Sequence, residues 1–71
     1  MPFVISAFYD QPSGEISEVY LKKDGIRAFY DTLEEACEVA ERMLELLPKA
    51  SSIVVSQYGG AGPRREFRRP T

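Results

Sequence analysis

The residues of this chain best suited to chemistry are four carboxylates with helical spacing. They follow one another at i, i+4, i+7 and i+11, and they are Glu34, Glu38, Glu41 and Glu45. On a helix these positions fall along one face. Neighbours at this spacing lie about 5–6 Å apart, and like charges there repel by roughly a few tenths of a kcal/mol per pair. We call this row the acidic ridge.

The ridge has three interpretations. A line of carboxylates imitates a line of phosphates, so it could dock into a basic surface such as a groove built for nucleic acid. A helix face selected only for stability would mix lysine with the glutamates, and here Arg42 is the one local base. The simpler interpretation is a solvated face that keeps a small domain soluble. In the third interpretation the ridge binds the protein's own basic tail.

A second group of chemically capable residues lies near the C-terminus, in "RREFRR". Arginine contacts phosphate, and an aromatic ring can stack on a base. The residues concerned are Arg64, Arg65, Phe67, Arg68 and Arg69. Glu66 interrupts the patch, and the acidic body would repel a duplex beyond the first contact. The tail therefore predicts either contact with nucleic acid or pairing with an acidic surface.

The remaining reactive side chains favour packing. Most of the aromatic residues belong in a core, with tyrosine hydroxyls at its rim, and the strands lack the mixture of basic and aromatic residues that would bind single-stranded bases. Cys37 lies on the apolar side of the predicted helix, where packing is its expected role. The chain has no histidine, so it lacks the commonest general base and metal ligand. We therefore expect no catalytic site, no metal and no cofactor.

Length and composition indicate one small domain. Seventy-one residues with 44% hydrophobic content suit a single globular unit of modest stability. One cysteine cannot form an intramolecular disulfide, which fits a reducing compartment. No apolar run reaches the roughly 20 residues that span a bilayer, and "MPFVISAFYD" has no positive leader. We therefore expect a cytoplasmic protein without membrane contact.

Charge divides the chain into an acidic body and a basic end. Residues 1–63 hold ten acidic and five basic side chains, a balance of −5, whereas residues 64–71 hold four arginines and Glu66, a balance of +3. This split is the most informative feature of the composition.

The alternation of apolar and polar residues, together with turn-forming residues, predicts the strands and the helix that carry the acidic ridge and the other groups described above. Residues 3–9, 15–22 and 26–30 are expected as strands of an antiparallel meander, with Asp24-Gly25 as a hairpin turn between the last two. A helix should follow, and then a final strand over 51–58. The order β-β-β-α-β predicts an α+β two-layer sandwich.

The helix has clear start and stop signals. Asp31 with Glu34, or Thr32 with Glu35, satisfies the spacing of a capping box, and Pro48 ends the helix. The apolar residues between them fall on the half of the cylinder opposite the ridge; they are Leu33, Ala36, Cys37, Val39, Ala40, Met43, Leu44, Leu46 and Leu47. This half should rest on the sheet.

The segment after the last strand is expected to leave the domain. "GGAGP" is typical of a hinge, and in the tail only Phe67 could anchor a further edge strand. We therefore predict a single domain over 1–58, and a hinge with a flexible, arginine-rich tail over 59–71.

The sequence "FYDTLEEACEVAERMLELL" resembles the start of the helix in HicB-type antitoxin domains, which share the β-β-β-α-β order. The matching residues are Asp31, Thr32, Glu34, Glu35 and Ala36. The match covers under a third of the chain, and "KKDGIRAFY" stands where such domains carry a segment with proline and glycine. The C-terminal DNA-binding domain of that family has no counterpart in these residues. Membership would imply an antitoxin-type domain.

Size, acidity and element order also resemble those of small phage-encoded inhibitors, including anti-CRISPR proteins, a class without a shared motif. Together these features predict a non-enzymatic binding protein, an inhibitor or nucleic-acid mimic, that docks the acidic ridge on a partner, most simply another protein. The alternatives are a nucleic-acid-binding regulator that uses the arginine tail, and the HicB-like domain. A domain this small could also form a homodimer through an unpaired strand edge.

Overall fold

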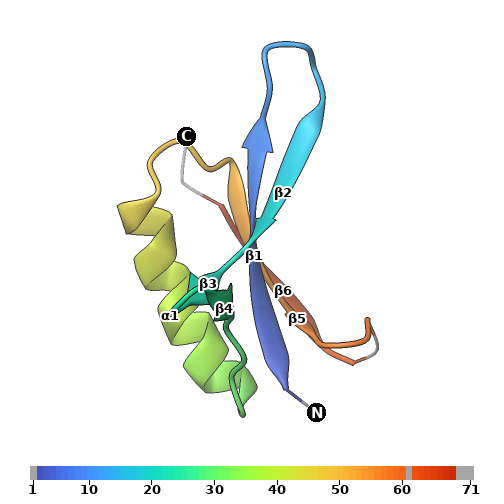
Figure 1. The fold of residues 1–71 in the computed structure, drawn as a ribbon, viewed down its shortest axis with the longest axis vertical. Coiled ribbons are helices and arrows are strands. Elements are labelled where there is room, and N and C mark those ends of the chain that lie inside the picture. Colours follow the sequence, from blue (N-terminus) through green and yellow to red (C-terminus); the bar gives the residue numbers. More distant parts are fainter. Residues whose placement is uncertain (1, 61, 69–71) are drawn as a thin grey trace.

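The computed structural model describes residues 2–60 and 62–68 of the chain, and their fold is α+β. Four strands form an antiparallel sheet in the order β2-β1-β5-β6, and one helix lies against it (Figure 1). The strands of this sheet are β1 (Phe3–Asp10), β2 (Ile16–Tyr20), β5 (Ser52–Gln57) and β6 (Arg64–Arg68). A two-stranded hairpin, β3 (Lys22–Lys23) with β4 (Ile26–Arg27), lies between β2 and the helix α1 (Leu33–Leu46) in the chain.

The first two predicted strands form the hairpin β1–β2. The pairing runs from Ser6 opposite Tyr20 to Asp10 opposite Ile16. At the turn, the Gln11 amide donates to the Glu15 carbonyl at 2.8 Å. The predicted second strand, 15–22, is divided in the structure: its first part is β2, and Lys22–Lys23 belongs to the separate hairpin.

The predicted three-stranded meander is wrong at its third strand. The Asp24-Gly25 turn forms as expected, with φ of 55° and 83° at its two residues, but β4 ends at Arg27 rather than continuing to residue 30. Tyr30 alone returns to the sheet: the Phe3 amide donates to the Tyr30 carbonyl at 2.7 Å, and the Tyr30 amide donates to the Phe3 carbonyl at 2.9 Å. Because β2 already pairs with the other half of β1, only this end of β1 is left for the returning chain.

The predicted helix and its cap are confirmed, although Leu46 of the predicted apolar half is 62% exposed. Thr32 has extended backbone angles, and its Oγ1 accepts a hydrogen bond from the Glu35 amide at 3.2 Å. Of the two possible caps, the structure therefore uses Thr32. The Leu47 amide donates to the Met43 carbonyl at 2.8 Å, and Pro48 follows. Ala36 and Ala40 are fully buried, so small side chains line the close approach of the helix to the sheet.

The core lies between α1 and one face of the sheet. Its most buried large side chains are Ile5, Ile53 and Val55. The helix packs mainly over β5 and also contacts β1 and β6. The predicted final strand is confirmed as β5, which runs antiparallel to β1.

The prediction of a flexible tail is wrong for Arg64–Arg68. This segment is β6, which pairs antiparallel with β5 from Ser52 opposite Arg68 to Ser56 opposite Arg64. Phe67 lies opposite Ile53 and packs against the core, which anchors the strand. Glycines of the preceding segment, including Gly59 and Gly60, have positive φ and let the chain reverse. Residues 61 and 69–71, with Arg69 of the predicted tail, lie outside the described residues.

Across residues 2–60 and 62–68 there is no helix with the length and apolar content needed to cross a membrane.

Candidate functional site

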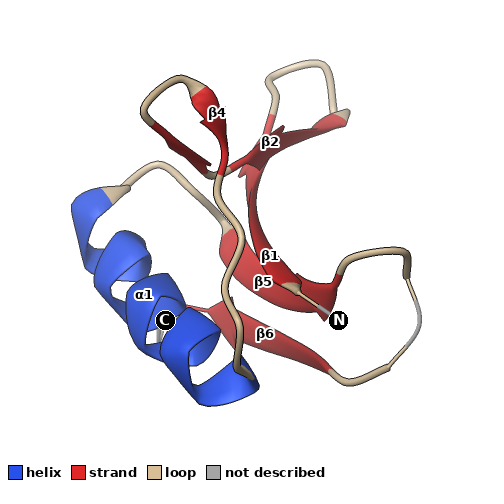
Figure 2. Ribbon diagram, turned by 60° about the horizontal axis from the view of Figure 1, so that its bottom comes forward, coloured by secondary structure: helices blue, strands red, loops and turns tan. Residues whose placement is uncertain are grey.

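The sheet has one covered face and one open face. Figure 2 shows α1 against one side of the curved sheet, with the other side free of it. Because strand residues alternate between faces, the register assigns each residue to one side. The open face consists of Val4, Ser6, Phe8, Asp10, Ile16, Glu18, Tyr20, Ser52, Val54, Ser56, Arg64, Glu66 and Arg68.

The acidic ridge lies on the outside of α1, away from the sheet. All four of its glutamates are exposed. Within the described part of the chain, none of them forms an ion pair. Glu38, Glu41 and Glu45 surround a shallow depression of about 300 Å³ together with Arg42. The ridge is therefore exposed along its length and forms no ion pair in the described residues, with Arg42 beside three of its glutamates.

The structure divides the predicted arginine tail between the two faces. Arg64 and Arg68 belong to the open face, whereas Arg65 and Phe67 belong to the covered face. The Arg68 Nε lies 2.9 Å from Glu66 Oε1, and this hydrogen bond lowers the pKa of the Glu66 carboxyl below its ordinary value. Arg64 forms no ion pair with any other described residue, so its guanidinium is available to a ligand.

A cluster around Arg27 was missed by the sequence analysis. The Arg27 Cζ lies 3.5 Å from the ring centroid of Tyr20 and 5.5 Å from that of Tyr58. Phe29 meets Tyr58 edge to face, with ring centroids 5.3 Å apart and an interplanar angle of 80°. We call these four residues the Arg27 cluster. The sequence signal that could have pointed to this cluster was the hairpin turn beside Arg27. The residues of the cluster are up to 38 positions apart in the chain, so the sequence did not show that they meet.

Two clefts border the open face. One, of about 440 Å³, is lined by Tyr20, Arg27, Tyr58 and the glycine turn, among others. The second, of about 240 Å³, is lined by Phe8, Ser52, Arg64, Glu66 and Arg68, among others. Basic and aromatic side chains therefore occur together here, which the strand sequences alone did not indicate.

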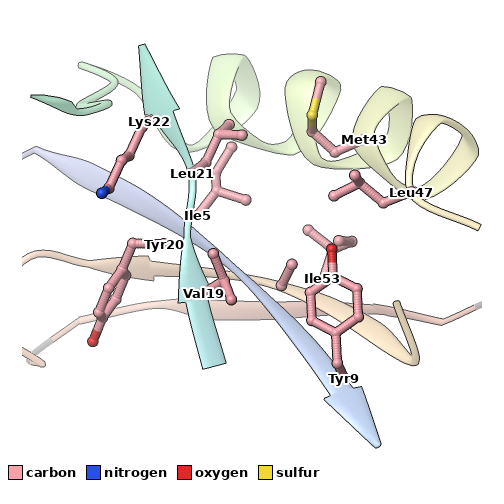
Figure 3. Close-up of a pocket in the computed structure, with 10 residues that line it drawn as sticks. Ile5, Tyr9, Val19, Tyr20, Leu21, Lys22, Met43, Leu47 and Ile53 are labelled. Atoms are coloured by element: carbon pink, nitrogen blue, oxygen red, sulfur yellow. The ribbon is translucent and has the colours of Figure 1, made fainter. Parts of the chain in front are cut away.

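An apolar pocket of about 200 Å³ opens on the covered side, where the helix does not extend over β2. Figure 3 shows Met43 and Leu47 of α1 facing Ile5, Val19 and Leu21 across it. Its walls are almost entirely hydrocarbon, so it offers mainly packing surface.

Cys37 is half-buried on the sheet side of α1. Burial raises the pKa of its thiol; Arg65 acts in the opposite direction, and Glu41 and Glu34 add to the increase. The thiol is therefore a weak nucleophile at neutral pH. In the described residues, histidine, cysteine and acidic side chains form no group of three or more that could hold a metal ion.

Comparisons of the chain with protein-family models, with curated proteins and with solved structures find no match. The likeness to HicB-type domains therefore rests on the residues at the start of the helix, where Thr32 acts as the cap.

Proposed function

We propose that this protein is a small non-enzymatic binding module that docks the acidic ridge on a basic surface of a partner protein. The observation that carries the proposal is the exposure of all four glutamates without an ion pair to any described residue. The opposite side of the same helix packs on the sheet, so the ridge is held in one orientation. Because the helix is already held against the sheet, its backbone loses little freedom on binding.

The ridge has the dimensions of a short charged rod. At a rise of 1.5 Å per residue, Glu34 and Glu45 are separated by roughly 16 Å along the helix axis. A cleft lined by positive charge attracts such a row electrostatically, and this attraction increases the association rate more than the final affinity. A protein groove that normally holds nucleic acid is a surface of this kind. Occupation of that groove would make the protein an inhibitor, as anti-CRISPR proteins are.

The ridge costs the helix stability, which supports a role in binding. Adjacent glutamates at this spacing repel, and each mixed-charge pair would instead stabilise the helix by roughly 0.2–0.5 kcal/mol. The double substitution Glu38→Lys and Glu41→Lys creates such pairs with Glu34 and Glu45. We expect this variant to be folded and no less stable than the natural chain.

The experiment compares binding partners captured from a cell extract by three proteins. They are the natural chain, the Glu38→Lys/Glu41→Lys variant, and a control with the same net charge, Glu15→Lys/Glu18→Lys, which leaves the ridge intact. We expect the same partner on the natural chain and the control, loss from the ridge variant, and displacement by added duplex DNA. Equal capture by the ridge variant would contradict the proposal.

A further inference from the structure

We propose that the open face of the sheet binds single-stranded nucleic acid, with bases stacked on the Arg27 cluster and phosphates held by arginines of β4 and β6. This site is separate from the acidic ridge, which lies on the outer side of α1. It differs from the tail-based prediction because it needs the paired sheet rather than a free segment.

The Arg27 cluster presents both groups that a single strand needs: aromatic rings for the bases and a guanidinium for the phosphates. Tyr58 is 48% exposed and Phe29 is 50% exposed, so their rings are available to stack on a base. Tyr20 positions Arg27, whose guanidinium lies against its ring. A guanidinium stacked on a ring keeps its outward N–H groups free to bind phosphate. The buried Nε of Arg27 has no hydrogen-bond partner in the described residues, so stacking rather than hydrogen bonding holds the side chain there.

A strand that joins the two clefts passes over a floor that neighbouring side chains already cover. This floor is made of small side chains that are nearly inaccessible: Ser6 and Val54 are each 3% exposed, and Ser52 is 5% exposed. With strands about 4.8 Å apart, four strands span roughly 14 Å between the outer strand axes. An extended single strand of a few nucleotides can therefore cross from the Arg27 cluster to Arg64 and Arg68.

The charges on this face favour a ligand that binds by stacking as well as by charge. The basic groups are Arg27, Arg64 and Arg68, and the acidic groups are Asp10, Glu18 and Glu66. Glu66 is paired with Arg68. Three basic and three acidic groups give this face little net charge to attract a duplex. The bases of a duplex are already stacked on each other, so the exposed rings would add little binding energy. Single strands supply free bases, and their phosphates need only the three arginines.

The test measures the binding of labelled oligo-dT and oligo-U, and of a labelled duplex, to the full chain at low salt by fluorescence anisotropy. We expect at least one single strand to bind, and the duplex to bind more weakly. Each phosphate contact contributes about 0.7 to the slope of log K against log salt. Three arginines therefore predict a slope of about −2 or shallower.

Substitutions then separate stacking from charge. Tyr58→Leu and Phe29→Leu keep apolar bulk but remove the aromatic ring, and each should weaken binding by about tenfold or more. Arg64→Gln should weaken binding a few-fold and make the salt slope shallower, whereas the matched control Arg42→Gln, on the helix, should not. All four positions are exposed, and circular dichroism checks that each variant is folded.

Three results would overturn the proposal: no binding of either single strand, affinities unchanged in both leucine variants, or a duplex that binds as tightly as the single strands. The Glu38→Lys/Glu41→Lys variant distinguishes this proposal from the proposed function, because it changes the acidic ridge and leaves the open face intact. Because it adds positive charge on the outer side of α1, it should bind the oligonucleotides at least as tightly as the natural chain even where partner capture is lost.

Discussion

The outer face of α1 and the open face of the sheet differ in charge and in how the chain builds them. The helix face draws its glutamates from residues 34–45 and carries one sign of charge apart from Arg42. The open face draws residues from β1, β2, β5 and β6, with Arg27 of β4 beside it, and mixes both signs with aromatic rings. The helix face is thus a local pattern, whereas the open face is an assembly of distant segments.

The two sides of the sheet also differ in what buries them. On the covered face, Ile53 is 0% exposed beneath α1. On the open face, its neighbour Val54 is 3% exposed although no helix lies above it. Nearly equal accessibility therefore arises beneath the helix on one side and without a helix on the other.

The largest expected effect tests this difference. Ile53→Ala removes packing against the helix and should lower the free energy of unfolding by about 2–5 kcal/mol. Val54→Ala removes less hydrocarbon from a site without a helix above it, and should cost about 1–2 kcal/mol. Urea denaturation followed by circular dichroism measures both. Equal losses would show that the open face is packed as tightly as the covered one.

A smaller effect tests how the acidic helix is anchored. Thr32→Ala removes the Oγ1 acceptor of the Glu35 amide and should lower the free energy of unfolding by about 1 kcal/mol. Asp31→Ala is the matched control, since the alternative cap is not used, and its change should stay within about 0.5 kcal/mol. Thermal unfolding of both variants measures the difference. A larger loss for Asp31→Ala would assign the cap to the other residue.

The smallest effect concerns the exposed ion pair on β6. Arg68→Gln removes the hydrogen bond that lowers the pKa of Glu66, so this pKa should rise toward its ordinary value in an NMR pH titration. Because the folded pKa is lowered, the pair stabilises the fold above the unfolded pKa of Glu66 and loses this effect as pH falls through the folded pKa. Both side chains are exposed, so we expect no measurable change in unfolding midpoint. Arg64→Gln should change the Glu66 pKa less.

The parts of the structure that the sequence predicted are those with local causes. The helix follows from its capping residues, its apolar half and Pro48, and the acidic ridge follows from the same periodicity. Strands β1 and β5 are short runs of β-branched and aromatic residues between turn signals. The Asp24-Gly25 turn formed because its two residues tolerate positive φ.

The errors arose where pairing depends on distant residues. The predicted strand 26–30 stopped at Arg27 because β2 already pairs with most of one edge of β1. The predicted tail became β6 because Phe67 reaches the core beside Ile53, a contact between positions 14 residues apart. Neither the free edge of β5 nor the space for Phe67 can be recognised from the residues of the tail.

By itself the sequence determined the α+β class, the capped helix and the row of glutamates on its outer face. Helical spacing alone places those side chains, whatever the sheet does. Only the tertiary structure decided that β6 joins the sheet, that Arg64 and Arg68 point away from the helix, and that Arg27 lies over the ring of Tyr20 and near that of Tyr58. These placements depend on which strands pair and in which register, because a shift of one residue moves every side chain of a strand to the other face.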